Sequence, residues 1–358
     1  MTFDDNMERI VYADYLRVIG ILSVIGIHLS LSYLSECTAF TDIWFQGALA
    51  ESLTRAGVLL FIMVSGMLLL DRDEPLSKVP ERLKRVLVPF YFWLFYYFMK
   101  DVLIDHQLLN VNSVNTFFIE LMNVIIDPTK ISIEFWYIYM IAAFYLMLPL
   151  LYKMIKNLSE KEIEYFLVIW FAVLLLNFFK YKLYIFNYMN LFVGPLGYFI
   201  LGYYLTKKDS KYTRSKLFGL FLFIVGVIIL FLSVYIPAII AGHTDSSYIL
   251  VGNIEPGSCI KMIGLFIIFK NIDFKKAFGK YSDKINSLVI KLAGYTYGIY
   301  LIVNIPLDLI KDYGYFNLEI SPFINIPIII AVSILASIII LWIMNKIPIL
   351  RRFTGMKN

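Results

Sequence analysis

Apolar runs, each close to the length that crosses a lipid bilayer, recur along the whole chain. A helix rises about 1.5 Å per residue and needs about 20 apolar residues to cross the hydrocarbon core. Polar connections separate the runs, so the pattern predicts an all-α, polytopic membrane protein with about ten transmembrane helices. The predicted spans are 12–34, 46–70, 87–104, 135–152, 163–180, 190–206, 216–241, 257–270, 291–310 and 323–345.

Composition excludes a soluble fold of the same length. Of the 358 residues, 60% are hydrophobic and 16% are charged, whereas soluble domains have about 45–50% and about 25%. We expect a single membrane-embedded domain over 1–358, with no soluble domain attached. The first run is too long for the apolar part of a cleaved signal peptide and lacks a small-residue cleavage site, so we expect it to stay in the protein.

Basic residues gather in alternate connections between the spans. They cluster around 72–85, 153–161, 207–216 and 270–291 and in the tail from 346, while the intervening connections hold few. Because positively charged connections stay in the cytoplasm, the alternation predicts a multi-pass protein of the cell membrane with both termini cytoplasmic. The net charge of +5 then reflects topology, and we expect membrane lipid but no nucleic acid among the partners.

The first span carries two ionisable side chains, Arg17 and His28. They are eleven positions apart, which brings them to within about 20° of one helical face and about 16 Å apart along the axis. Arg17 is then near the cytoplasmic interface, where an arginine often only snorkels, and His28 lies deep in the bilayer. An imidazole at that depth needs a partner and is suited to act as a general base, so His28 and Arg17 are the candidate catalytic residues.

The second span carries Glu51 and Arg55 in its outer half. They are four residues apart and can form an ion pair on one helical face. Their depth is close to that of His28, so they are candidates to line a substrate-binding pocket beside it. The alternative is an ion pair that faces other helices and satisfies itself.

Further candidates for substrate binding lie near the ends of the spans. Arg82 and Arg85 on the cytoplasmic side suit phosphate groups, although a basic cluster there also follows from topology. Ser65, followed by a glycine, would let a ligand or another helix approach the backbone closely. Glu134 and Trp136 at an outer mouth could act on a polar substrate, although Trp at the end of a span is usually an interfacial anchor.

Metal ligands and further functional histidines are not indicated. Cys37 and Cys259, without a CxxC pair, predict neither a disulfide scaffold nor a zinc site, and we expect no metal. His106 and His243 lie in predicted outer loops, where histidines are usually solvated. Lys261 lies in a short apolar run and needs a carboxylate or carbonyl partner, which the sequence does not identify.

Six short motifs in a fixed order resemble those of the acyltransferase-3 family of bacterial membrane enzymes, and they extend over nearly the whole chain. Arg17 and His28, with ten residues between them, resemble the family's R-x10-H signature. One position departs from the pattern: where a histidine often follows Tyr-Leu-Ile, this chain has Val303 and then Asn304. The other motifs are Phe-Ile-Met-Val-Ser-Gly at 61–66, the basic run at 82–85 before Pro89, Phe-Trp-Tyr at 135–137 with Pro149 downstream, Gly-Tyr-Phe-Ile-Leu-Gly at 197–202 and Thr-Tyr-Gly-Ile-Tyr-Leu-Ile at 296–302.

The resemblance implies an O-acyltransferase that uses acyl-CoA, acetyl-CoA above all, as co-substrate and a surface or lipid-linked carbohydrate as acceptor. The phosphates of the donor would bind near Arg82 and Arg85, its thioester arm would follow the Arg17 face, and His28 would take the proton of a sugar hydroxyl.

Two alternatives stay open. Ten spans with buried charges also suit a transporter or flippase of a glycan precursor, although no paired Gly/Pro-broken spans at corresponding positions in the two halves are evident in the sequence. The histidine missing at position 303 also allows an inactive partner of a glycan-assembly complex.

Overall fold

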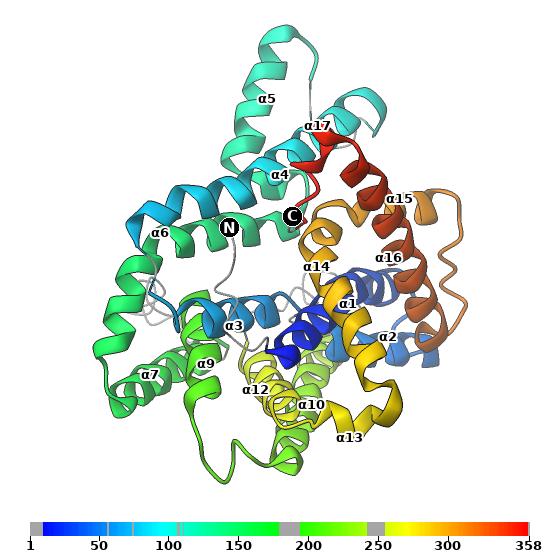
Figure 1. Cartoon of the computed structure of the whole chain (residues 1–358). Helices are drawn as coiled ribbons and strands as arrows, with labels where there is room; N and C mark the ends of the chain where they lie inside the picture. Colours follow the sequence, from blue (N-terminus) through cyan, green and yellow to red (C-terminus); the bar gives the residue numbers. More distant parts are fainter. Residues whose placement is uncertain are drawn as a thin grey trace.

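The computed structural model of the chain describes residues 10–55, 57–73, 75–105, 108–109, 111–178, 194–241 and 255–356. Within these ranges every regular element is a helix and no strand occurs, and Figure 1 shows α5 projecting from the rest of the molecule. The α-helices are α1 Val11–Glu36, α2 Asp42–Thr54, α3 Gly57–Leu69, α4 Val79–Lys100, α5 Val114–Ile126, α6 Trp136–Asn157, α7 Glu160–Phe178, α9 Pro195–Lys207, α10 Lys216–Ala241, α12 Pro256–Lys270, α13 Phe274–Phe278, α14 Ser282–Ile302, α15 Asn304–Asp312, α16 Pro322–Lys346 and α17 Pro348–Arg351.

Single-turn helices connect several of these elements. Those that matter below are Pro128–Lys130 and Ile133–Phe135, which lead from α5 into α6. The others are Leu76–Lys78 before α4, the π-helical turn Asp101–Asp105 after it, and Gly279–Tyr281 before α14.

Seven helical segments in the described part of the chain are long and apolar enough to cross a membrane. They overlap seven of the predicted spans, and they confirm an all-helical membrane fold. The three remaining runs correspond to α7, α9 and α12, of which α9 has 13 residues, α12 has 15, and α7 begins with charged residues. The count of ten and the cytoplasmic position of both termini therefore stay predictions. The seven segments are Val11–Glu36, Asp42–Leu69, Leu76–Asp105, Ile133–Asn157, Lys216–Ile240, Phe274–Ile302 and Pro322–Lys346.

The expected second span is not one continuous helix. α2 ends at Thr54 and α3 begins at Gly57, and Arg55 leaves the helical region with φ −50° and ψ 142°. The break lies against α1, because a Cβ on Gly57 would come within 2.6 Å of the Gly20 carbonyl oxygen. A side chain at position 57 would push the two helices apart, so glycine is required for this approach.

The expected ninth span is also broken, between α14 and α15 at Val303. Pro306 explains this break, since it has no N–H to donate to the carbonyl of Ile302 and its ring crowds that carbonyl. The second and ninth predicted spans are therefore each made of two helices. Each break frees backbone groups inside the membrane region, which other parts of the protein must then satisfy.

Two of the family-like motifs meet at the crossing of α3 and α9. A Cβ on Gly66 would overlap the carbonyl of Phe199, and a Cβ on Gly202 would overlap the carbonyl of Met63. The glycines of the 61–66 and 197–202 motifs thus allow two helices to touch backbone to backbone. α3, which carries Ser65, also packs against α1.

The outward face of α16 is a stripe of exposed apolar side chains. They recur at spacings of three and four residues, as on one face of a helix. In a membrane protein such a face is in contact with lipid. The stripe consists of Ile324, Ile328, Val332, Leu335 and Ile339.

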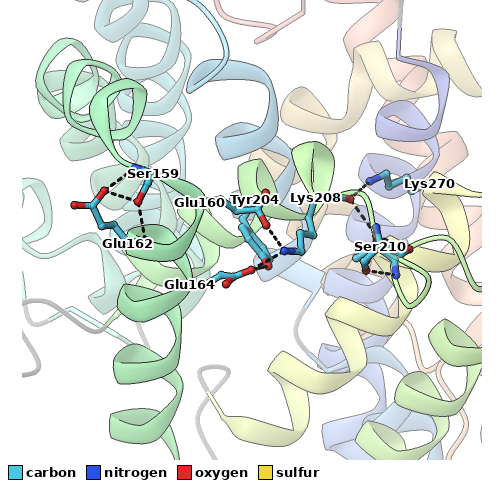
Figure 2. A network of polar contacts seen from close by, with 9 residues as sticks. Ser159, Glu160, Glu162, Glu164, Tyr204, Lys208, Ser210 and Lys270 are labelled. Carbon is cyan, nitrogen blue, oxygen red and sulfur yellow. Dashed lines mark hydrogen bonds and ion pairs between the residues drawn. The ribbon is translucent and has the colours of Figure 1, made fainter.

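A polar network ties α7, α9 and α12 together at one end of the helices (Figure 2). Lys208 lies just after α9 and forms ion pairs with Glu160 and Glu164 of α7. Lys270 at the end of α12 donates to three backbone carbonyls, those of Leu205, Thr206 and Lys208, at 2.7, 3.2 and 3.0 Å. The first two belong to the last turn of α9, which leaves them without a helical partner, and the third belongs to the residue that follows the helix.

Candidate functional site

His28 faces a carboxylate from another helix segment. Its Nε2 lies 3.8 Å from Glu134 Oε2, and the imidazole side chain is 29% exposed while the Glu134 side chain is 8% exposed. His28 belongs to the uninterrupted helix α1, and Glu134 belongs to the turn Ile133–Phe135 that leads into α6. The deep histidine predicted from the sequence therefore has an acidic partner inside the protein.

Glu134 is held by its side chain and by its backbone. Asn304 Nδ2 donates to Glu134 Oε1 at 2.7 Å and to Ser132 Oγ at 2.9 Å. The Tyr300 hydroxyl donates to the backbone carbonyl of Glu134. The carboxylate is left with Oε2 turned towards His28, so the structure aims a fixed negative charge at the imidazole.

Arg17 lies on the same helix as His28, nearer its N-terminal end, and is half-buried. Its Nη1 is 3.5 Å from Asp14 Oδ1, one turn earlier in α1. The Tyr137 hydroxyl interacts with the Ser65 side chain and with the charge of Arg17. Ser65, Arg17 and Tyr137 are thus brought together from α3, α1 and α6.

Tyr137 connects the Arg17 end of the site to the Glu134 end. Its ring packs edge-on against Tyr300, with centroids 5.6 Å apart, and lies tilted against Phe61, with centroids 6.2 Å apart. Trp136 beside it is partly buried, and its ring meets that of Tyr137 at right angles with centroids 6.5 Å apart. An aromatic wall therefore runs between the two ends of the site.

Arg82 and Arg85 lie in the first turns of α4, at the end of the site away from His28. The Arg82 guanidinium lies 5.7 Å from the ring centroid of Tyr145 on α6. Arg85 is exposed. Tyr145 is also close enough to Tyr137 and Tyr297 for their hydroxyls to interact electrostatically.

Glu51 and Arg55 form the ion pair that their spacing predicts, and both are buried. Arg55 also faces Glu255, with Nη1 3.8 Å from Oε1. Lys261 Nζ donates to the carbonyls of residues 52, 53 and 55 at 2.7, 3.2 and 2.6 Å. Glu51 and Arg55 thus make contacts at the helix break and at the start of α12.

Lys261 therefore has the carbonyl partners that the sequence could not identify. Two of them are among the last carbonyls of α2 and the third is that of Arg55, just after it; the break before α3 leaves them without helical donors. The same reasoning from sequence missed Ser132, Tyr300 and Tyr137, which carry no charge and resemble ordinary interfacial residues. Asn304 was visible only as the neighbour of an unusual Val303.

No group of three or more His, Cys, Asp or Glu lies together as metal ligands do in the ranges that the structure covers. His106 and His243 fall outside those ranges. The chemistry that the site offers is an imidazole next to a fixed carboxylate, which is the arrangement of a general base and the group that orients it.

Comparison with known families and proteins agrees with this chemistry. Residues 10–342 match the model of a family described as an acyltransferase domain. Comparison with curated proteins and with solved structures gave no match. A match over nearly the whole length, together with an imidazole–carboxylate pair in an all-helical membrane fold, shows that this chain belongs to the acyltransferase-3 family.

Proposed function

We propose that the protein transfers an acyl group, acetyl in the first instance, from cytoplasmic acyl-CoA to a hydroxyl of a surface or lipid-linked carbohydrate. The observation that carries the proposal is the His28–Glu134 pair, 3.8 Å between Nε2 and Oε2, on a chain of this family. The position of both termini in the cytoplasm and the identity of donor and acceptor are part of the proposal.

In this reaction His28 acts as general base. The imidazole nitrogen not turned towards Glu134 takes the proton of the acceptor hydroxyl, and the hydroxyl oxygen attacks the thioester carbonyl carbon. The C–S bond breaks, and the imidazolium returns the proton to the CoA thiolate. Glu134 stabilises the imidazolium while it exists, since a fixed charge nearby needs no reorganisation.

The donor enters from the end of the site that carries the arginines. Arg82 and Arg85 bind its phosphates, because guanidinium groups match phosphate oxygens well. Its arm passes Tyr145 and Tyr137 towards His28, and Arg17 and Ser65 help to place the thioester. Glu134 and Trp136 line the part of the site that binds the acceptor.

For Glu51 and Arg55 the proposed role is support of the helix break. The contact of Arg55 with Glu255 and the hydrogen bond from Lys261 to the Arg55 carbonyl favour this role over direct binding of substrate. The break brings Gly57 against α1 between Arg17 and His28. Glu51 and Arg55 therefore affect the site indirectly, by fixing where the backbone of α3 packs on α1.

The test measures thiol release from acetyl-CoA by purified protein in detergent. His28→Ala should lower the rate by about 10²–10⁴-fold, the usual contribution of a general base. His106→Ala, a histidine of a predicted outer connection, is the matched control and should retain the wild-type rate. Equal rates for His28→Ala and the wild type would exclude the proposed base.

A transporter or flippase is the competing function. The interrupted second and ninth predicted spans do not hold corresponding positions in two halves of five spans, as the repeats of many transporters do. Saturable binding of acetyl-CoA separates the two, since a transporter of glycan precursors has no use for it. Arg82→Ala combined with Arg85→Ala should weaken that binding at least tenfold. Binding without any turnover would instead favour an inactive partner of a glycan-assembly complex.

A further inference from the structure

Asn304 is the first residue of α15 and follows directly on the position that departs from the family pattern. Val303 is 2% exposed and packs in the main apolar core, so it brings no polar group to the site. Asn304 does: its amide donates to Glu134 Oε1 and to Ser132 Oγ. A primary amide has two N–H donors, and both are used here.

The break between α14 and α15 places these donors. α14 ends at Ile302 and α15 begins at Asn304, and the helix is interrupted between them because Pro306 has no N–H for the Ile302 carbonyl. Tyr300, in the last turn of α14, holds the backbone carbonyl of Glu134. One stretch of five residues therefore fixes the carboxylate and the backbone of Glu134 from the same side.

The chemistry of the amide suits this task. A carboxylate with one oxygen held at 2.7 Å loses rotational freedom, and its second oxygen stays towards His28. An amide is neutral at every working pH, so it does not compete with His28 for the charge of Glu134. A cationic group at this place would pair with the carboxylate and weaken its effect on the imidazole.

We infer that Asn304 is a positioning residue of the acyl transfer. It orients Glu134, and Glu134 in turn stabilises the protonated form of His28, so the site works without a histidine at position 303. The inference rests on the proposed function and goes beyond it, because it assigns a role to a residue outside the family-like motifs.

The decisive experiment is a double-mutant cycle on thiol release from acetyl-CoA. Asn304→Leu alone should lower kcat about 10- to 100-fold with KM for acetyl-CoA within twofold of the wild type, because the donor binds elsewhere. Glu134→Gln alone should lower kcat at least as far. In the Glu134→Gln background, Asn304→Leu should have no further effect, because Asn304 acts through Glu134. Independent effects that multiply would overturn the inference.

Asn325 provides a matched control for the loss of a buried amide. It lies on α16 and is 4% exposed. Its Nδ2 donates to Tyr33 Oη and to the Asn317 carbonyl, both at 2.8 Å. Asn325→Leu should lower thermal stability but leave kcat within twofold. If Asn304→Leu behaves like Asn325→Leu, its role is structural and the inference is wrong.

The failures of the two proposals are distinguishable. If His28→Ala turns over acetyl-CoA at the wild-type rate, the proposed function is wrong, and so is the inference that depends on it. Turnover that depends on His28 but not on Asn304 contradicts only the inference.

Discussion

Replacement of Lys261 by methionine should destabilise the protein far more than the same change at Lys270. Both lysines are on α12, and each ammonium donates to three carbonyls at the C-terminal end of another helix, α2 for Lys261 and α9 for Lys270. Methionine keeps most of the apolar stem and removes the donors. The two changes delete the same number of hydrogen bonds, so any difference reflects their surroundings.

The surroundings differ in burial and in charge. Lys261 is 0% exposed and lies beside the buried residues Glu51, Arg55 and Glu255, so two acidic groups are balanced by two basic ones. Loss of one basic group leaves a buried charge uncompensated, which costs about 3–5 kcal/mol. A carbonyl left without a donor costs about 1–3 kcal/mol more. Lys270 is only partly buried, so water can replace its ammonium at a cost of about 1 kcal/mol or less.

The assay is thermal unfolding of purified protein in one detergent, with the yield of monodisperse protein recorded for each variant. The two costs for Lys261→Met together come to about 4–8 kcal/mol. At about 2–4 °C per kcal/mol, Lys261→Met should lower Tm by about 8–32 °C and Lys270→Met by about 4 °C or less. A third variant, Lys261→Met with Glu255→Gln, restores the charge balance and should recover part of the loss. Equal falls for the two lysines, or no recovery by Glu255→Gln, would refute the reasoning.

Two further predictions concern the crossing of α3 and α9 and the ion pairs of Lys208. Gly66→Ala should lower Tm by several degrees, because the added Cβ would overlap the Phe199 carbonyl. Gly294→Ala is the control: nothing lies within 4 Å of a Cβ there, so Tm should stay equal or rise. Similar falls in Tm for both variants would contradict the backbone crossing. Hydrogen bonds to Glu160 and Glu164 raise the pKa of Lys208. Their stabilisation is therefore complete below the ordinary lysine pKa of about 10.4 and is lost progressively as the pH rises from there through the raised value. Lys208→Gln should therefore lower Tm equally at pH 7 and pH 9, and a difference that disappears by pH 9 would be inconsistent with the raised pKa.

Features that depend on neighbours in the chain could be predicted well. Arg17 and His28 lie on one uninterrupted helix, as their eleven-residue separation indicates. The Glu51–Arg55 ion pair forms at the four-residue spacing that favours it. Helical periodicity and apolar length are local properties, so they can be read without knowledge of the partners.

Features that depend on distant residues could not be predicted. The broken second span has no proline to mark it, and its free carbonyls are satisfied by Lys261, more than 200 positions away. The Glu134 carboxylate is oriented by Asn304, 170 positions away. No spacing rule connects such residues, because their approach depends on how whole helices pack.

The amino-acid sequence by itself determined that the protein is a helical membrane protein with an arginine and a histidine on one face of its first span, since hydrophobicity and helical period act within each segment. Tertiary structure alone decided which groups face that histidine and how the broken helices are satisfied. In a membrane interior every freed carbonyl and every charge needs a partner from the protein, and only the packing of the helices settles which partner that is.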